Sequence, residues 1–138
     1  MPLTIYTHPD CLKHEMGINH PECPERLEVI SQKLKQASIA SQLEWKEAPL
    51  ATKDQLKRVH DSAYIEFIFS QSPRQGYVPL DPDTIMNPFT LSAALRASGA
   101  QVAAVDEVFS AKTKRAFCLV RPPGHHAELH EAMGFSFF

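Results

Sequence analysis

The sequence is poor in three features that mark particular classes of protein: paired cysteines, excess charge of one sign and long apolar runs. Its three cysteines, Cys11, Cys23 and Cys118, are an odd number without a Cys-x-x-Cys pair, which argues against a disulfide framework and a structural zinc knot. We therefore expect a reducing, cytoplasmic setting. A formal net charge of −2 offers no basic surface for nucleic acid, so we expect no such partner.

No apolar run approaches the ~20 residues of a membrane span, so we expect no membrane partner. The N-terminal Met-Pro-Leu-Thr-Ile-Tyr lacks the basic and then apolar layout of a secretion signal. What is present is ordinary for one globular domain: 138 residues, of which 43% are apolar and 22% are charged.

Strand and helix patterns alternate along the chain, which predicts an α/β fold with a central parallel sheet flanked by helices. The first strand, 3–7, is rich in β-branched and aromatic residues, and the last, 116–120, is an apolar run typical of a buried parallel strand. Between them we expect a loop over 8–24, a helix over 25–37, a strand over 43–48, a helix opened by a capping box at Thr52, a proline-rich loop without regular structure over 71–90, and a helix from residue 90 or 92 to 111.

The spacing of apolar residues predicts which face of each helix is buried. The helix after Thr52 would bury Leu56, Val59, Ala63 and Phe67, unless the Asp-Ser pair at 61–62 interrupts it. The long helix would bury a row made up of Leu91, Leu95, Val102, Val105 and Phe109.

Two loops that carry histidines each follow a strand of the predicted sheet. His8, His14 and His20 lie after the strand 3–7, and a Pro-Pro-Gly-His-His segment lies after 116–120. Ligands of open α/β sheets bind beyond the carboxyl ends of the strands. We therefore expect both loops to face the same rim.

His125 and His126 are the strongest candidates for chemistry in this chain. Neutral imidazole accepts a proton near pH 7 and is also a common metal ligand. Neighbouring residues on an extended segment point to opposite sides, so the pair suits acid–base catalysis better than chelation of one metal; a solvated loop stays an open alternative. His126 and His130 are four apart, but the segment is not the His-Glu-x-x-His of metalloproteases, so we expect a solvated His130.

Gly134 and Phe135 form a second pair of interest. Glycine lets a backbone approach a ligand closely, and an adjacent phenyl ring can wall an apolar channel. The alternative is a turn glycine followed by a strand that enters the core.

Taken together, these motifs resemble a known family. Arg121-Pro-Pro-Gly-His-His-Ala-Glu128, followed by Met133-Gly-Phe-Ser-Phe-Phe138, resembles the zinc-dependent histone deacetylase superfamily, which includes bacterial histone-deacetylase-like amidohydrolases, acetoin-utilisation proteins and acetylpolyamine amidohydrolases. Three upstream blocks occur in the family's order: His20-Pro-Glu-Cys-Pro-Glu-Arg-Leu27, Val59-His-Asp-Ser-Ala-Tyr64 and Leu80-Asp-Pro-Asp-Thr84. The resemblance spans essentially the entire chain and implies the N-terminal part of an arginase/deacetylase-type fold.

The resemblance implies a hydrolase that acts on an amide C–N bond and removes acetyl from acetyl-lysine, an acetylpolyamine or another small acetylated amine. In the family, zinc polarises the amide carbonyl and lowers the pKa of a bound water. By position, His126 would be the general base and then the acid, and His125 the partner that positions water and stabilises the developing charge.

The resemblance also assigns the substrate tunnel. Phe135 would form one wall, and Gly134 would give close backbone contact. His20 and Pro21 would border the tunnel mouth. Asp83 resembles the rim acid that binds the substrate backbone in some members; Asp81 is the alternative, and a turn cap is the other reading of either acid. Arg26 would be structural or would lie near an interior channel.

The sequence departs from the family in two respects. Ser136 stands where a cysteine commonly follows Gly-Phe, a small change. The family's zinc ligands lie downstream of the His-His motif, and no upstream His or Asp corresponds to them. We therefore interpret residues 1–138 as a single incomplete domain, the N-terminal part of a deacetylase domain, that binds no zinc, is inactive by itself and self-associates.

Two other interpretations stay open at this stage. One is a non-catalytic module whose histidine loops bind a metal for structure. The other is a short homologue that serves as a regulatory or assembly partner.

Overall fold

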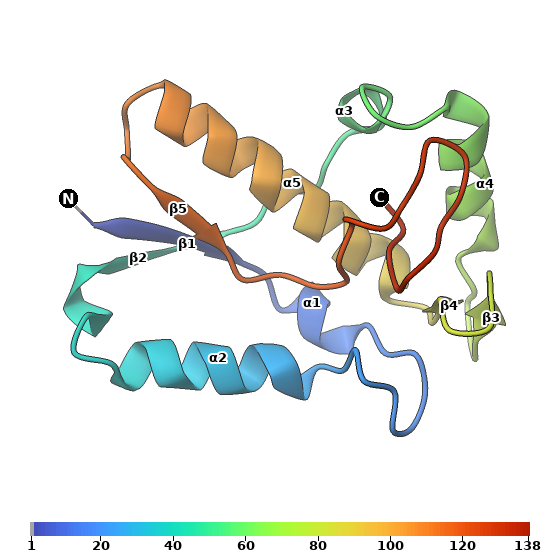
Figure 1. Ribbon diagram of the computed structural model, residues 1–138, viewed down its shortest axis with the longest axis horizontal. Coiled ribbons are helices and arrows are strands. Elements are labelled where there is room, and N and C mark those ends of the chain that lie inside the picture. Colours follow the sequence, from blue (N-terminus) through green and yellow to red (C-terminus); the bar gives the residue numbers. More distant parts are fainter. Residues whose placement is uncertain (1) are drawn as a thin grey trace.

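The computed structural model describes residues 2–138 and has a three-stranded parallel sheet at its centre (Figure 1). The strands lie in the order β2 (Leu43–Glu47), β1 (Leu3–Thr7) and β5 (Ala116–Cys118). On the central strand, Ile5 lies opposite Trp45 of β2 and Phe117 of β5. Because the strands are parallel, their carboxyl ends share one edge of the sheet, and the predicted α/β class is confirmed.

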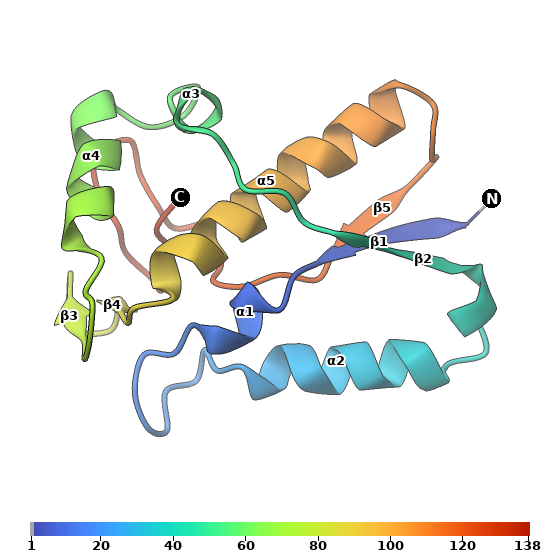
Figure 2. The ribbon, with the colours of Figure 1, turned by 180° about the vertical axis from the view of Figure 1, so that it is seen from behind.

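Helices cover both faces of this sheet. Figures 1 and 2 show α2 (Glu25–Gln36) on one face and α5 (Thr90–Phe109) on the other. Side chains alternate along β1, so Ile5 belongs to a core cluster with Leu27 of α2, while Tyr6 belongs to one with Ala100 of α5. The core therefore has two layers, one on each side of the strands.

The buried face of α5 consists of small residues, so the predicted row of large apolar side chains is wrong. Val105 is 55% exposed and Phe109 is 88% exposed, while Leu91, Leu95 and Val102 are only partly buried. The buried residues are Thr90, Ala93, Ala94, Ala97, Gly99, Ala100 and Ala104. Small side chains let the helix backbone approach the sheet closely. The spacing of large apolar residues in the sequence does not indicate which helix face makes that approach.

The capping box at Thr52 is present, but the helix that it opens is short. α3 (Lys53–Leu56) ends after one turn, and α4 (Ser62–Gln71) begins after a break. The break resets the helical phase, so Leu56 is buried as predicted, whereas Val59, Ala63 and Phe67 are exposed. The buried side chains of α4 are Tyr64, Ile65 and Ile68.

Two predicted loops contain short regular elements. The segment 71–90 holds an antiparallel pair of β3 (Val78–Pro79) and β4 (Ile85–Met86), so the exclusion of regular structure there is wrong. A two-residue ladder tolerates Pro79 because it needs few backbone donors. The loop 8–24 contains α1 (Asp10–Lys13), and a 3₁₀ turn, η1 (Ala40–Gln42), precedes β2.

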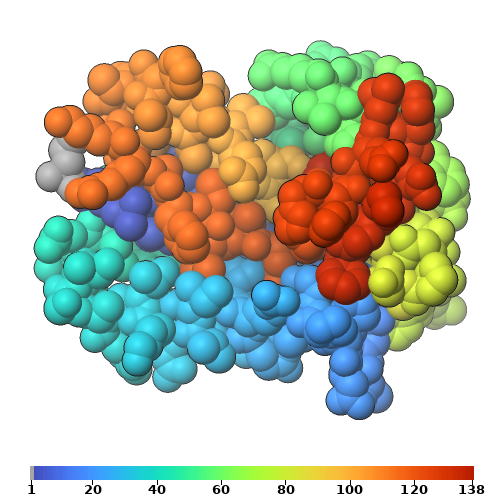
Figure 3. Space-filling model, in the orientation of Figure 1, coloured from blue at the N-terminus to red at the C-terminus, as the bar shows by residue number. Residues whose placement is uncertain are grey.

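The segment after β5 crosses the surface between α4 and the β3–β4 hairpin, as the red and yellow regions of Figure 3 show. Within residues 2–138, no helix is both long and apolar enough to cross a membrane. All three cysteines are free thiols.

Candidate active site

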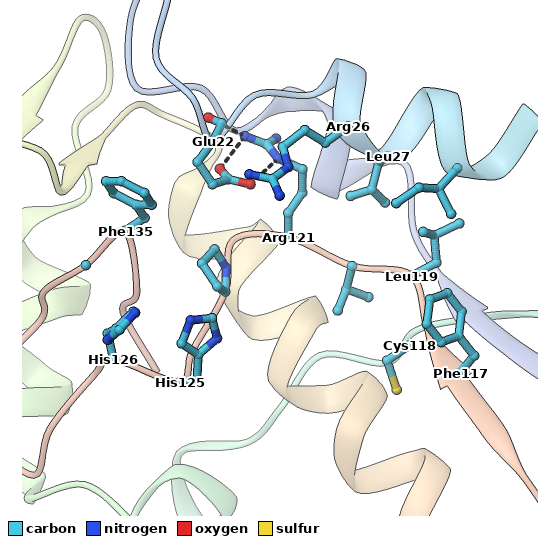
Figure 4. A pocket seen from close by; sticks show the side chains of 14 residues that line it. Glu22, Arg26, Leu27, Phe117, Cys118, Leu119, Arg121, His125, His126 and Phe135 are labelled. Atoms are coloured by element: carbon cyan, nitrogen blue, oxygen red, sulfur yellow. Dashed lines mark hydrogen bonds and ion pairs between the residues drawn. The ribbon is translucent and has the colours of Figure 1, made fainter.

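A cavity of ≈ 470 Å³ extends along β5 and past its carboxyl end (Figure 4). Figure 4 shows His125, His126 and Phe135 grouped at one end of this cavity, and Phe117 and Cys118 at the other. The wall between them is formed by α2 and by the residues that follow β5. A set of side chains from distant parts of the sequence therefore meets in one concave region, of the kind that binds small ligands.

The two histidines lie side by side. Their ring centroids are 4.4 Å apart with a tilt of 58°, and both side chains are exposed and line the cavity. The expectation that they point to opposite sides is wrong, because the chain turns at His125–His126 instead of running extended. Of two imidazoles on one wall, one can move a proton while the other stabilises charge.

Gly134 gives His126 the room that it occupies. A Cβ at Gly134 would lie 2.7 Å from Cγ of His126, closer than real side chains approach. Gly134 also has a φ of +56°, in the left-handed region that favours glycine. The glycine is therefore required both by the turn and by the histidine ring.

Phe135 lines the cavity and contacts His20, which lies beside the cavity. Their ring centroids are 4.8 Å apart and nearly perpendicular, an edge-to-face contact. The ring of His20 is held at both nitrogens, because Nδ1 accepts from the backbone N–H of Glu22 at 3.1 Å and Nε2 lies 3.0 Å from the backbone oxygen of Asp83. The neutral tautomer with hydrogen on Nε2 satisfies both bonds.

Asp81 and Asp83 have different surroundings. The Oδ1 atom of Asp81 accepts from the backbone N–H groups of Asp83 and Thr84, at 2.9 and 2.6 Å, so Asp81 is the cap of this turn. Burial raises the pKa of Asp81, but these hydrogen bonds outweigh burial and leave it below its usual range. Asp83 is exposed, and its backbone oxygen lies beside His20. Pro21 is also exposed, and its oxygen accepts from Arg26 at 3.4 Å.

A buried ion pair between Arg121 and Glu22, which the sequence did not reveal, lines the cavity. Arg121, 3% exposed, donates to both carboxylate oxygens of Glu22, at 2.8 and 2.7 Å. It also donates to the backbone oxygens of Cys11 and His14. The pair joins the start of the histidine loop to the loop that carries His20. Its members are 99 positions apart, so no local pattern could have paired them.

His14 extends this buried network. Its Nδ1 lies 2.7 Å from the hydroxyl of Thr90 and its Nε2 lies 3.5 Å from Glu22. Burial lowers the pKa of His14, and the charge of Arg121 adds to that effect, so the ring is neutral at pH 7 even though Glu22 opposes the shift. Burial raises the pKa of Glu22, but the contact with His14 and the hydrogen bonds from Arg121 outweigh burial and lower the pKa below the usual range.

The Val-His-Asp-Ser-Ala-Tyr block, whose last three residues belong to α4, bonds to the loop that carries Gly134 and Phe135. The Nδ1 atom of His60 lies 2.8 Å from the oxygen of Glu128, and the hydroxyl of Tyr64 donates to the oxygen of Phe137. Burial raises the pKa of Tyr64, so its hydroxyl keeps its proton. These bonds fix both sides of the loop that carries Gly134 and Phe135.

The side chains of residues 2–138 include no group of three or more His, Cys, Asp or Glu arranged to hold a metal ion. His126 and His130 lie on an irregular segment, and His130 is 68% exposed in its side chain. The described residues therefore do not supply the ligand set of a zinc site.

The chain is similar to known proteins both in sequence and in structure. Residues 20–138 match the family model described as the histone deacetylase domain. The chain is 34% identical to histone deacetylase 5 of Arabidopsis thaliana, over 97% of this chain and 21% of that protein. It is 34% identical to the histone deacetylase-like amidohydrolase of Pseudomonas aeruginosa, over 86% of this chain and 31% of that protein.

A solved structure gives the same result. The crystal structure of the HDA15 HD domain superposes on 99% of this chain with a TM-score of 0.91 and 31% sequence identity. The match covers 40% of the solved chain. The present chain thus spans about a fifth to two fifths of the length of these relatives.

Proposed function

The chain belongs to the histone deacetylase family, and from this premise we propose that it contributes the acid–base half of a site that hydrolyses the amide bond of an acetylated amine. The observation that carries this proposal is the convergence of His125, His126 and Phe135 on one cavity past the end of β5. Amide hydrolysis is assisted by a positioned group that moves protons, and this cavity places two imidazoles beside an aromatic ring.

We assign the proton transfers to the histidine pair. His126 takes a proton from the attacking water as the new C–O bond forms, and it returns a proton to the amine nitrogen as the C–N bond breaks. The products are acetate and the free amine. His125, whose ring lies 4.4 Å from that of His126, orients the water and stabilises the developing charge.

The substrate class follows from the aromatic rings at the cavity. The rings of Phe135 and His20 offer apolar faces to a linear acyl-amine chain, and Asp83 and Pro21 lie exposed near His20. Acetyl-lysine in a protein, an acetylpolyamine or another small acetylated amine has this shape. The alternative of a non-catalytic metal-binding module predicts instead that loss of either histidine impairs folding.

Activity assays of the protein expressed from its complete gene test this assignment. His126→Ala should lower kcat for an acetyl-lysine peptide by about 10²–10⁴-fold, the usual contribution of a general base. His130→Ala is the matched control, because His130 lies exposed on the same segment and should leave the rate unchanged. Equal losses in both variants, or a loss of thermal stability in place of a loss of rate, would contradict the assignment.

We propose that the complete domain requires zinc, which would supply a polarised carbonyl and an activated water when bound. Because residues 2–138 offer no metal cluster, we expect the isolated 138-residue chain to bind no stoichiometric zinc and to hydrolyse no acetyl-lysine peptide. Metal analysis after dialysis, together with an acetate-release assay, measures both. A zinc content near one per chain would refute the expectation.

We propose that the isolated 138-residue chain associates with itself through the outer edge of β5. We also propose a reducing, cytoplasmic setting, in keeping with three free thiols.

A further inference from the structure

The turn that carries Phe135 has an unusual backbone. Met133 and Ser136 exchange backbone hydrogen bonds of 3.2 and 2.9 Å, and the two central residues have φ values of +56° for Gly134 and +69° for Phe135. Two positive φ values match a type I′ turn, whose central positions favour Gly, Asn and Asp. A phenylalanine there needs support from outside the turn.

Thr84 gives that support. Its Oγ1 accepts a hydrogen bond from the backbone N–H of Phe135 at 3.1 Å, across 51 positions of sequence. Thr84 is fully buried, so no water competes for this bond. The hydroxyl is therefore a fixed acceptor for the backbone N–H of Phe135. The direction of that N–H sets where the Phe135 side chain points.

Thr84 is itself anchored. Its backbone N–H donates to Asp81 at 2.6 Å, and its backbone oxygen accepts from Leu80 at 2.9 Å. The same turn presents the oxygen of Asp83 to Nε2 of His20 at 3.0 Å. One turn, residues 80–84, thus fixes both aromatic rings, His20 through Asp83 and Phe135 through Thr84.

We propose that Thr84 is a positioning residue that holds the Phe135 ring against His20 and so limits the width of the acyl group that the channel admits. The inference rests on the proposed function, because it assumes that the acyl chain passes these rings. It adds a specificity role for a residue that contacts neither the substrate nor the histidine pair.

Two substitutions separate positioning from a general effect on stability. Thr84→Val keeps the shape and removes the acceptor, and Thr84→Ser keeps the acceptor and removes a methyl group. In nuclear magnetic resonance spectra of the 138-residue chain, we expect Thr84→Val to speed amide exchange of Phe135 by about tenfold, the effect of one lost hydrogen bond. The His20 ring protons should move toward the shifts of free histidine as the Phe135 ring departs. Thr84→Ser should keep both signals near wild type.

The specificity arm uses the protein expressed from its complete gene. The measurement is the ratio of kcat/KM for a branched isobutyryl-lysine peptide to that for the matched acetyl-lysine peptide. Thr84→Val should raise this ratio by about tenfold, within the range that one or two methylene groups produce in an apolar pocket. Thr84→Ser should keep the wild-type ratio.

The outcomes are distinct. A Thr84→Val chain that melts earlier but keeps the Phe135 exchange rate, the His20 shifts and the acyl ratio overturns the proposal. If Thr84→Val does not fold, the wild-type exchange rate of the Phe135 amide decides. Exchange as fast as that of an exposed loop amide overturns the proposal. Slow exchange that Thr84→Ser preserves supports the proposal. If the wild-type protein hydrolyses neither peptide, the proposed function fails, and the resonance measurements alone decide whether Thr84 positions Phe135.

Discussion

Gly99 shows how little space separates α5 from the segment that follows β2. A Cβ at this position would lie 1.9 Å from the backbone oxygen of Pro49 and 2.8 Å from the backbone nitrogen of Ala51. Backbone atoms cannot rotate away as a long side chain can. In an exposed helix, alanine in place of glycine stabilises by about 1 kcal/mol, so the sign of the effect depends on this contact.

We expect Gly99→Ala to lower the free energy of unfolding by about 1–3 kcal/mol, the usual cost of overpacking. Gln101→Ala is the control, because Gln101 is exposed on the same helix and should change stability by less than about 0.5 kcal/mol. Urea denaturation measures both. A Gly99→Ala chain as stable as wild type would mean that α5 can move away from Pro49 without loss.

The stretch after β5 depends on a distant contact, because Arg121 joins it to the loop that carries His20. Replacing one member of a buried ion pair leaves the other charge without compensation. We therefore expect Glu22→Gln to lower the free energy of unfolding at pH 7 by about 3–5 kcal/mol. Glu66→Gln is the matched control, because the Lys53–Glu66 pair is exposed and should cost about 1 kcal/mol or less.

The same pair predicts a pH dependence. The pKa of Glu22 is lower in the folded state than its ordinary value of 4.5, so its stabilising effect is complete above about pH 4.5 and is lost as the pH falls through the folded pKa. The stability difference between wild type and Glu22→Gln should therefore be constant near neutral pH and shrink in acid. Denaturation curves at pH 7, 5, 4 and 3 measure it. A stability difference that grows in acid would contradict a lowered pKa of Glu22 in the folded state.

At the scale of elements, the sequence predicts what local physics decides. The strand 3–7, the helix that begins at Glu25 and the capping box at Thr52 follow from propensities within a few residues, and the structure contains all three. The buried face of α5 was mispredicted, because close packing of small residues depends on what the helix meets. The contact between Phe135 and His20 was not predicted, because it depends on two separate turns.

For the candidate site, the motifs gave the residue types but not their arrangement. His125, His126, Gly134 and Phe135 were selected because they match a family pattern, and the structure places them around one cavity. Thr84 and Glu22 were missed as site residues, since a buried threonine or glutamate has no distinctive local signal. Their partners lie 51 and 99 positions away, and only the fold brings them together.

At the scale of the whole molecule, the two outer strands of the sheet differ in how their free edges are protected. β2 reads Leu-Glu-Trp-Lys-Glu and carries three charged residues, which discourage pairing with another chain. β5 reads Ala-Phe-Cys and has none. Within residues 2–138, β5 has a neighbour on one side only, which is β1.

Apolar side chains border that free edge. Phe117 is 44% exposed, and a groove of ≈ 480 Å³ beside it is lined by Val105, Val108 and Phe109 of α5. An uncharged strand edge next to an apolar groove favours pairing with a second strand, because pairing satisfies the backbone groups of β5 and covers the groove at once. A second copy of the 138-residue chain carries the same edge, so an isologous contact is possible.

We therefore expect the isolated 138-residue chain to form dimers or larger assemblies, and Phe117→Lys to shift it toward the monomer by placing a charge at the edge. Ile18→Lys is the control, because Ile18 is 95% exposed but lies on a loop far along the chain from β5. Light scattering coupled to size-exclusion chromatography gives the mass of each. If wild type elutes as a monomer, the free edge of β5 does not drive association; if Ile18→Lys dissociates the assembly as well as Phe117→Lys does, the contact lies elsewhere. Dissociation by Phe117→Lys alone would place the interface at the strand whose carboxyl end leads into the histidine pair, so association and the candidate site would share one edge of the sheet.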